Sequence, residues 1–162
     1  MSLALLLTLA SAISAAAQTI QVTSSAFQSG APIPRFYSSY ADNHSPPLTW
    51  TAVPGAKVYA LTLRDPDAPN GTFTHWLIWN IPGNVTALPQ DGLPGVVLGK
   101  NDLGGLGYFG PHPPHGKHHY HFDIFALDAP LSLATGANVS ALDAAMKGHI
   151  MGKGELIGTY TP

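Results

Sequence analysis

Three segments of this chain carry the pattern of buried β-strands, whereas only one carries the pattern of a helix. Residues 57–64, 73–80 and 119–126 are rich in apolar, β-branched and aromatic side chains, and turns containing Gly, Pro or Asn separate them. Residues 140–148 begin with a capping-box-like Ser-Ala-Leu-Asp and end at a glycine, which is typical of a short helix. Weaker strand signals lie at 19–24, 96–98 and 155–160.

The order of these elements constrains the fold. Because strands and helices do not alternate along the chain, a parallel sheet built from strand–helix–strand units is not expected. Glycine and proline, 17 and 15 of the 162 residues, supply the turns that a chain of short strands needs. The sequence therefore predicts a mainly β protein, with two antiparallel β-sheets packed as a sandwich and one or two short helices at the side.

The composition is that of a globular protein. The chain is 45% hydrophobic and 10% charged, which is too apolar for a disordered sequence. Its formal net charge of -2 provides no basic field for nucleic acid, so we expect no nucleic-acid partner. It contains no cysteine, and a domain of this length can bury enough surface to fold without disulfides.

Residues 1–17 differ from the rest of the chain. An apolar run at 3–9 is followed by small residues that end in Ala15, Ala16 and Ala17 before Gln18. This order is typical of a secretory signal peptide, although no Lys or Arg precedes the apolar run. We predict a signal peptide at 1–17, a single domain at 18–162 and a secreted or periplasmic location. An apolar N-terminal arm is the alternative.

Alternation along the strands predicts where three ionisable side chains lie, because successive side chains of a strand point to opposite faces. Asp65 comes directly after the first strand and has the same parity as its apolar side chains. His118 comes directly before the third strand and has the same parity as the apolar side chains there. His75 shares a face with Leu77 and Trp79 in the same scheme. A buried ionisable group is unfavourable unless it is paired or hydrogen-bonded. If the strands are neighbours, we expect Asp65, His75 and His118 to satisfy one another at one rim of the sandwich.

The residues alone leave simpler interpretations open. A single histidine on an apolar face is more often a satisfied core residue than a ligand, and Asp65–Pro69 is also typical of an Asx turn that ends a strand. The segment Gly110–Gly116, however, is a stiff glycine–proline loop that leads histidines into the third strand. Such a loop can form the rim of a pocket because it keeps its shape without burying many side chains.

Several motifs resemble those of the phosphatidylethanolamine-binding protein family, also called the Raf kinase inhibitor-like family, and in particular its compact bacterial-type branch. The resemblance extends over nearly all of the chain after residue 17, in the family's order, and the combination is far more specific than any single motif. The matching segments are Ser45-Pro46-Pro47-Leu48-Thr49-Trp50, Asp65-Pro66-Asp67-Ala68-Pro69, His75-Trp76, Asn80-Ile81-Pro82-Gly83, the Gly110–Gly116 loop, His118-His119-Tyr120 and Phe125-Ala126-Leu127-Asp128.

The resemblance implies a sandwich of two antiparallel sheets with a small anion-binding pocket at one end. It implies that Asp65, His75 and His118 line this pocket. His119 stands where the family usually has arginine, which removes a fixed positive charge and a bidentate donor. The resemblance also implies ligand-binding or supporting roles for Asp67, Pro69, Gly110, Pro114 and Tyr120.

From these residues we predict a non-enzymatic binding protein for phosphate-type head groups, such as those of phosphatidylethanolamine-like lipids, with no cofactor and no metal. His75 and His118 are expected to donate to ligand oxygens. Asp65 is expected to orient an imidazole and favour its protonated form, so that binding strengthens at acidic pH. The family also implies inhibition or modulation of a partner protein, such as a kinase or protease, which secretion would place outside the cytoplasm.

Two other functions would use the same three residues. Asp65, His75 and His118 could form a metal site or a hydrolytic acid–base pair, and the five histidines between 112 and 121 suggest zinc. Against a metal, His118 and His119 point to opposite strand faces, and the loop histidines lack the i, i+4 spacing of helical ligands. Against hydrolysis, the sequence contains no GxSxG motif, cysteine nucleophile or HExxH motif.

Overall fold

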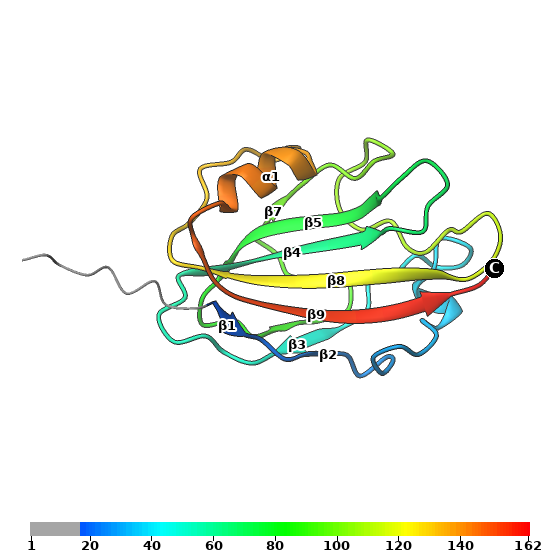
Figure 1. Ribbon diagram of the computed structural model, residues 1–162, viewed down its shortest axis with the longest axis horizontal. Helices are drawn as coiled ribbons and strands as arrows, with labels where there is room; N and C mark the ends of the chain where they lie inside the picture. The colour runs from blue at the N-terminus through cyan, green and yellow to red at the C-terminus, as the bar shows by residue number, and fades with distance from the viewer. Residues whose placement is uncertain (1–16) are drawn as a thin grey trace, which may run out of the picture.

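The computed structural model describes residues 17–162, in which two β-sheets pack together and one α-helix covers the outer face of the larger sheet (Figure 1). This architecture confirms the predicted fold class. The predicted signal peptide, apart from Ala17, lies outside the described residues. Within the described range, no helix is both long enough and apolar enough to cross a membrane.

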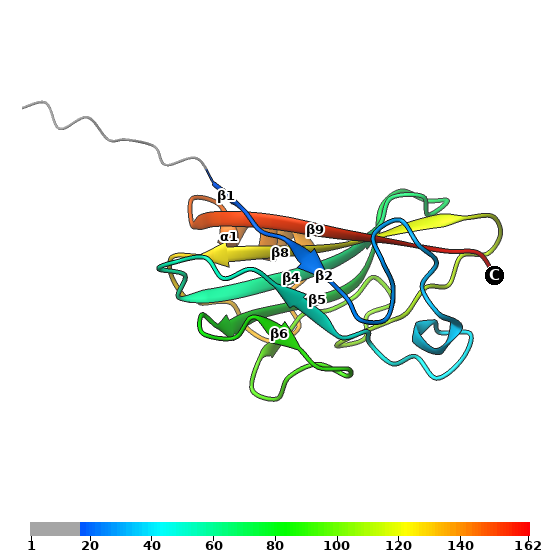
Figure 2. The ribbon, with the colours of Figure 1, turned by 90° about the horizontal axis from the view of Figure 1, so that it is seen from below.

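The larger sheet has six strands in the order β1-β9-β8-β4-β5-β7, and the smaller sheet has the order β2-β3-β6. Figure 2 shows the smaller sheet in front of the larger one, with α1 behind it. The strands of the larger sheet are β1 (Gln18–Thr19), β4 (Val58–Asp65), β5 (Phe73–Pro82), β7 (Val97–Leu98), β8 (His118–Leu127) and β9 (Ile150–Tyr160). The other elements are β2 (Val22–Thr23), β3 (Leu48–Trp50), β6 (Ala87–Leu88), the 3-10 helix η1 (Arg35–Tyr37) and α1 (Val139–Met146).

Two cores hold these layers together. Between the sheets lie Tyr59, Leu61 and Leu63 of β4, together with the alternating aromatic and aliphatic residues of β8. On the outer face, Leu142 and Met146 of α1 belong to a second core. This core also contains the apolar residues of β4 and β8 whose side chains point away from the smaller sheet. The central strands are therefore buried on both faces, which is why their sequences are nearly continuous apolar runs. Each fully buried Leu, Ile or Phe contributes about 1.5–3 kcal/mol.

The 19–24 segment differs from the prediction of a single strand. Its residues divide between the sheets: β1 pairs in parallel with β9, and β2 pairs antiparallel with β3. Ile20 lies between them, buried, and its N–H donates to Lys153 O at 2.9 Å. The chain thus crosses from one sheet to the other, which strand propensity alone does not reveal.

Strand β9 begins at Ile150, five residues before the predicted 155–160 segment. Gly152 and Gly154 weaken the strand signal there, because glycine is disfavoured in strands. A Cβ on Gly154 would collide with the carbonyl oxygen of Ile20, so glycine is needed for the close approach of the crossing segment.

The start of the helix also differs from the prediction. The N-cap is Asn138 and not Ser140, and its Oδ1 accepts from Ala141 N–H at 3.0 Å.

Strand β5 contains two bulges that the alternation scheme did not include. Opposite β4, Leu63 pairs with Trp76 and Arg64 with Thr74, so His75 is an extra residue. A bulge reverses the phase of the strand beyond it. Leu77 and Trp79 consequently pack in the helix-covered core, whereas Trp76 and Ile78 lie between the sheets. The prediction that Leu77 and Trp79 share a face with His75 is therefore wrong.

Candidate functional site

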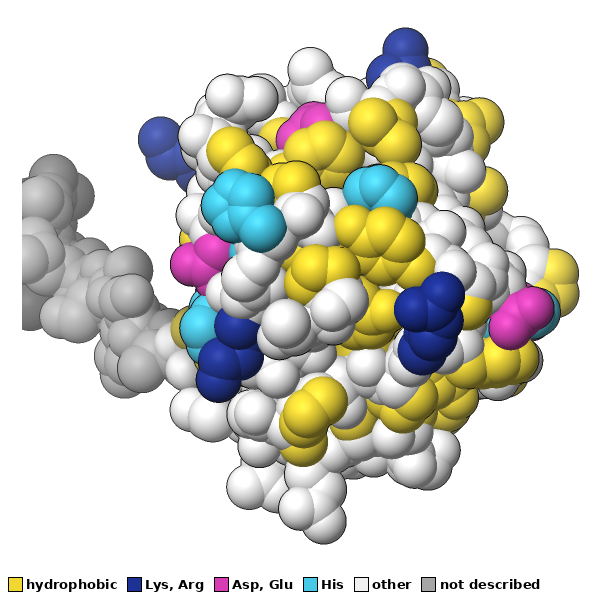
Figure 3. All heavy atoms as spheres, turned by 90° about the vertical axis from the view of Figure 1, so that its right-hand side faces the viewer, with side chains coloured by type: hydrophobic (Ala, Val, Ile, Leu, Met, Phe, Trp, Pro, Cys, Tyr) yellow, Lys and Arg dark blue, Asp and Glu magenta, His cyan; other side chains and the backbone are white. Residues whose placement is uncertain are grey.

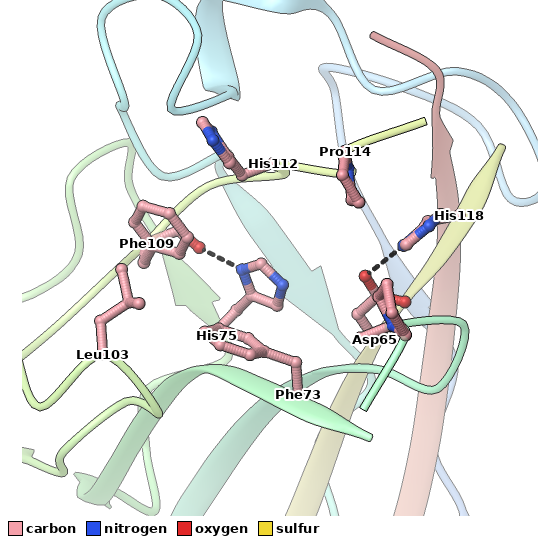
Figure 4. A pocket seen from close by; sticks show the side chains of 10 residues that line it. Asp65, Phe73, His75, Leu103, Phe109, His112, Pro114 and His118 are labelled. Carbon is pink, nitrogen blue, oxygen red and sulfur yellow. Dashed lines mark hydrogen bonds and ion pairs between the residues drawn. The ribbon is translucent and has the colours of Figure 1, made fainter. Parts of the chain in front are cut away.

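A pocket of about 280 Å³ lies at the end of the larger sheet, where β4 ends and where β5 and β8 begin. This end is on the right in Figure 1 and faces the viewer in Figure 3, where histidine and apolar side chains lie next to one another. Its floor comes from the strands and its rim from loops (Figure 4). The lining residues are Asp65, Ala68, Pro69, Phe73, His75, Leu103, Phe109, His112, Pro114 and His118.

Asp65 and His118 form a buried pair in this pocket. The Nδ1 atom of His118 lies 2.7 Å from Oδ2 of Asp65, and the two residues are only 5% and 3% exposed. The other carboxylate oxygen of Asp65 accepts from the N–H of Asp67 at 2.9 Å, which is the Asx turn suggested by the sequence. Oδ1 of Asp65 is therefore an acceptor, and Oδ2 accepts from His118 when the imidazole carries its hydrogen on Nδ1.

His75 is held by a different acceptor. Its Nδ1 donates to the carbonyl oxygen of Phe109 at 2.7 Å, and its ring stacks on the Phe109 ring with centroids 5.6 Å apart. The bulge in β5 makes this position possible, because it lets His75 lie on the side of Asp65 while Trp76 enters the core between the sheets. Burial lowers the pKa of His75, and the Phe109 carbonyl and the Asp65 charge offset only part of that effect.

Tyr120 lies beneath the pocket, fully buried, and does not line it. Its ring meets that of His75 edge to face, with centroids 5.2 Å apart. Burial, followed by the neighbouring Asp65 charge, raises the pKa of Tyr120, so this phenol stays neutral. Tyr120 therefore supports the orientation of His75.

Asp67 and Gly110 also lie outside the lining. Asp67 accepts from the backbone N–H and the Nδ1 of His119, at 2.8 and 2.7 Å, and the side-chain bond is the main cause of its lowered pKa. Gly110 is buried and donates to Asn43 Oδ1 at 2.7 Å. A Cβ on Gly110 would collide with Tyr37 O, so glycine brings this loop close to its neighbour.

The structure thus brings together Asp65, His75 and His118, with Pro69 and Pro114 on the rim. Sequence reasoning did not assign five further lining residues, which are Ala68, Phe73, Leu103, Phe109 and His112. Leu103 is 64% exposed and comes from a glycine-rich loop whose sequence carries no signal for a pocket. Phe109 directly precedes the Gly110–Gly116 loop and His112 lies within it, so this loop was the sequence signal that could have indicated both residues.

The polar lining is unusual in its charge. Asp65 is the acidic group, three imidazoles are the basic ones, and neither Lys nor Arg belongs to the lining. Positive charge in the pocket therefore depends on protonated histidine. No group of three or more His, Cys, Asp and Glu within residues 17–162 could hold a metal ion.

The sequence matches the phosphatidylethanolamine-binding protein family over residues 23–161. The chain belongs to this family. It is 49% identical to a UPF0098 protein of Methanothermobacter thermautotrophicus, over 83% of this chain and 94% of that protein. A crystal structure of the phosphatidylethanolamine-binding protein homologue CT736 from Chlamydia trachomatis has a TM-score of 0.85 and 38% identity, covering 90% of this chain and 99% of that one. YbcL of E. coli has a TM-score of 0.83 and 33% identity, covering 88% and 98%.

Proposed function

We propose that this member of the phosphatidylethanolamine-binding protein family reversibly binds small anions, in particular phosphate-type head groups, in the pocket at the end of the larger sheet. One observation carries the proposal: Asp65, His75 and His118, from three separate strands, meet in one hollow of about 280 Å³. Each imidazole is already anchored through Nδ1, so a ligand need not order it. Such preorganisation reduces the entropic penalty of binding.

Hydrogen bonds from histidine supply the attraction. A charge-assisted bond to an anion contributes about 1.5–3 kcal/mol. Two such bonds, reduced by desolvation, correspond to weak or moderate affinity for an isolated head group. Since His75 and His118 supply the positive charge, affinity for an acceptor-only anion increases as the pH falls.

The apolar rim supports a ligand that continues beyond its head group. Phe73, Leu103 and Phe109 surround the polar floor, and Leu103 is largely exposed. A glycerol or acyl portion of a phosphatidylethanolamine-like lipid would contact these side chains. The same rim would contact a protein partner that the ligand displaces, and the predicted secretion places such a kinase or protease outside the cytoplasm.

Calorimetric titration with O-phosphoethanolamine tests the proposal. His118→Ala is expected to weaken binding by about tenfold or more, because one charge-assisted bond is lost. His149→Ala is the matched control, since His149 also pairs with an aspartate, Asp128, at 2.7 Å but does not line the pocket. Unchanged affinity in His118→Ala would refute the proposal.

Hydrolysis is the second candidate function, because a carboxylate that orients an imidazole is also the arrangement of a general base. Phosphorus NMR of the same samples decides between the two functions. A binding protein leaves phosphoethanolamine intact over hours, whereas release of inorganic phosphate that is lost in His118→Ala would favour hydrolysis.

A further inference from the structure

His75 and His118, two of the three histidines that line the pocket, leave the same ring nitrogen for a ligand. Nδ1 of His75 donates to Phe109 O, and Nδ1 of His118 contacts Asp65 Oδ2, each at 2.7 Å. Figure 4 shows the second ring nitrogen of His75 pointing away from Phe109 and into the cavity. A ligand in the pocket therefore meets Nε2 of His75.

The two Nε2 atoms differ in what they offer. A carbonyl oxygen can only accept, so neutral His75 keeps its hydrogen on Nδ1 and its Nε2 is a hydrogen-bond acceptor. His118 faces a carboxylate instead of a carbonyl, and when both of its ring nitrogens carry hydrogen it keeps the contact to Asp65 through Nδ1 and presents Nε2–H as a donor. Burial lowers the pKa of His75, which favours the neutral form. The titratable groups around His75 are Asp65, His118 and Tyr120 from the strands, and Asp102 and His112 from the connection between β7 and β8.

We infer that the pocket selects phosphate monoesters in their singly protonated form over phosphodiesters and sulfate esters. The P–OH group of the monoester donates to Nε2 of His75, while another phosphate oxygen accepts from Nε2–H of His118. The phosphate of a phosphodiester and the sulfate of a sulfate ester carry only acceptors at mildly acidic pH, so they leave Nε2 of His75 unpaired or require that nitrogen to take a proton from solvent. This inference rests on the proposed function and narrows it: an intact phosphatidylethanolamine-like lipid is a phosphodiester, so the pocket would bind it more weakly than a phosphate monoester such as phosphoethanolamine.

Three soluble head groups test the inference at pH 5. O-phosphoethanolamine, O-sulfoethanolamine and glycerophosphoethanolamine share the ammonium group, and near pH 5 each bears about one negative charge, because the second pKa of a phosphate monoester is about 6. The monoester is expected to bind about tenfold more tightly than the other two, as a buried unpaired acceptor costs about that factor. Calorimetry in buffers of different ionisation enthalpy should show proton uptake with the sulfate ester and none with the phosphate monoester.

Equal affinity for the three compounds would overturn the inference and leave the proposed function intact. Absence of binding by all three compounds would overturn both the inference and the proposed function.

His75→Asn sharpens the test, because the amide can keep the bond to Phe109 O but has no counterpart of Nε2. The preference should fall below about twofold in His75→Asn, since a single hydrogen bond accounts for it. It should persist in His121→Asn, where the replaced histidine pairs with Glu155 outside the pocket. A preference that persists in folded His75→Asn overturns the inference.

Discussion

Two neighbouring histidine–aspartate pairs, His118–Asp65 and His119–Asp67, make the same contact in different surroundings. Each joins a histidine Nδ1 to an aspartate Oδ2 at 2.7 Å. The side chains of the first pair are 6% and 4% exposed, whereas those of the second are 46% and 41% exposed. One step along β8 thus separates a pair inside the pocket from a pair on the surface.

The difference shows that burial, and not the contact itself, decides the energetic role of such a pair. In water-like surroundings the attraction of two charges is screened, and an exposed pair contributes about 0–1 kcal/mol. In the interior, the loss of one partner leaves the other polar group without compensation. The buried pair is therefore expected to have a large effect on both stability and binding, and the exposed pair only a small one.

The largest effect is expected from Asp65→Ala. This change leaves His118 and the N–H of Asp67 without their acceptor, and we expect a loss of about 3–5 kcal/mol in the free energy of unfolding. Urea denaturation followed by tryptophan fluorescence measures it. Asp67→Ala is the matched control, with an expected loss below about 1 kcal/mol. Equal losses in the two variants would show that burial does not separate the pairs.

The pocket's pH dependence is the next effect. Because burial lowers the pKa of His75, its NMR titration midpoint should lie below that of an ordinary histidine. Sulfate stabilises the imidazolium, so saturating sulfate should raise the midpoint, and sulfate affinity should increase as the pH falls through it. The His75→Asn spectrum assigns the signal. A midpoint that sulfate leaves unchanged would place the anion away from His75.

A smaller effect is expected from His119→Arg, which introduces the residue usual in the family. A guanidinium near the rim should increase the affinity for sulfate by about twofold to fivefold at low salt, and the gain should shrink as salt is added. Calorimetry at two salt concentrations measures this change. A gain that is independent of salt would indicate a direct contact with the anion instead of a distant charge.

The smallest effect is expected from His119→Ala on stability. The lowered pKa of Asp67 means that its bond to His119 stabilises the fold above the ordinary carboxyl pKa, and that this contribution disappears as the pH falls through the lowered value. Exposure limits it to a fraction of about 1 kcal/mol. Chemical denaturation at a series of pH values should show a small difference from the unchanged protein at pH 7 that decreases as the pH falls below the ordinary carboxyl pKa. A difference that does not decrease in acid would have another origin.

The convergence of Asp65, His75 and His118 was predicted for a partly incorrect reason. Strict alternation placed His75 on the face of Leu77 and Trp79, but the bulge at His75 separates it from them. His75 nevertheless meets Asp65 and His118, because the same bulge turns it to their side of the sheet. A bulge depends on pairing with the neighbouring strand, so the sequence of one strand does not reveal it.

Local sequence determined much of this protein. Runs of β-branched and aromatic residues determined the central strands, because these side chains fit a pleated surface that is buried on both faces. The turns follow from glycine and proline, and the family follows from the motifs around Asp65, His75 and His118. Tertiary structure alone decided the rest: the crossing at Ile20, the bulge in β5, the apolar rim and the burial of one histidine–aspartate pair beside an exposed one. These features depend on contacts between segments far apart in the chain, and no local propensity encodes which surfaces will meet.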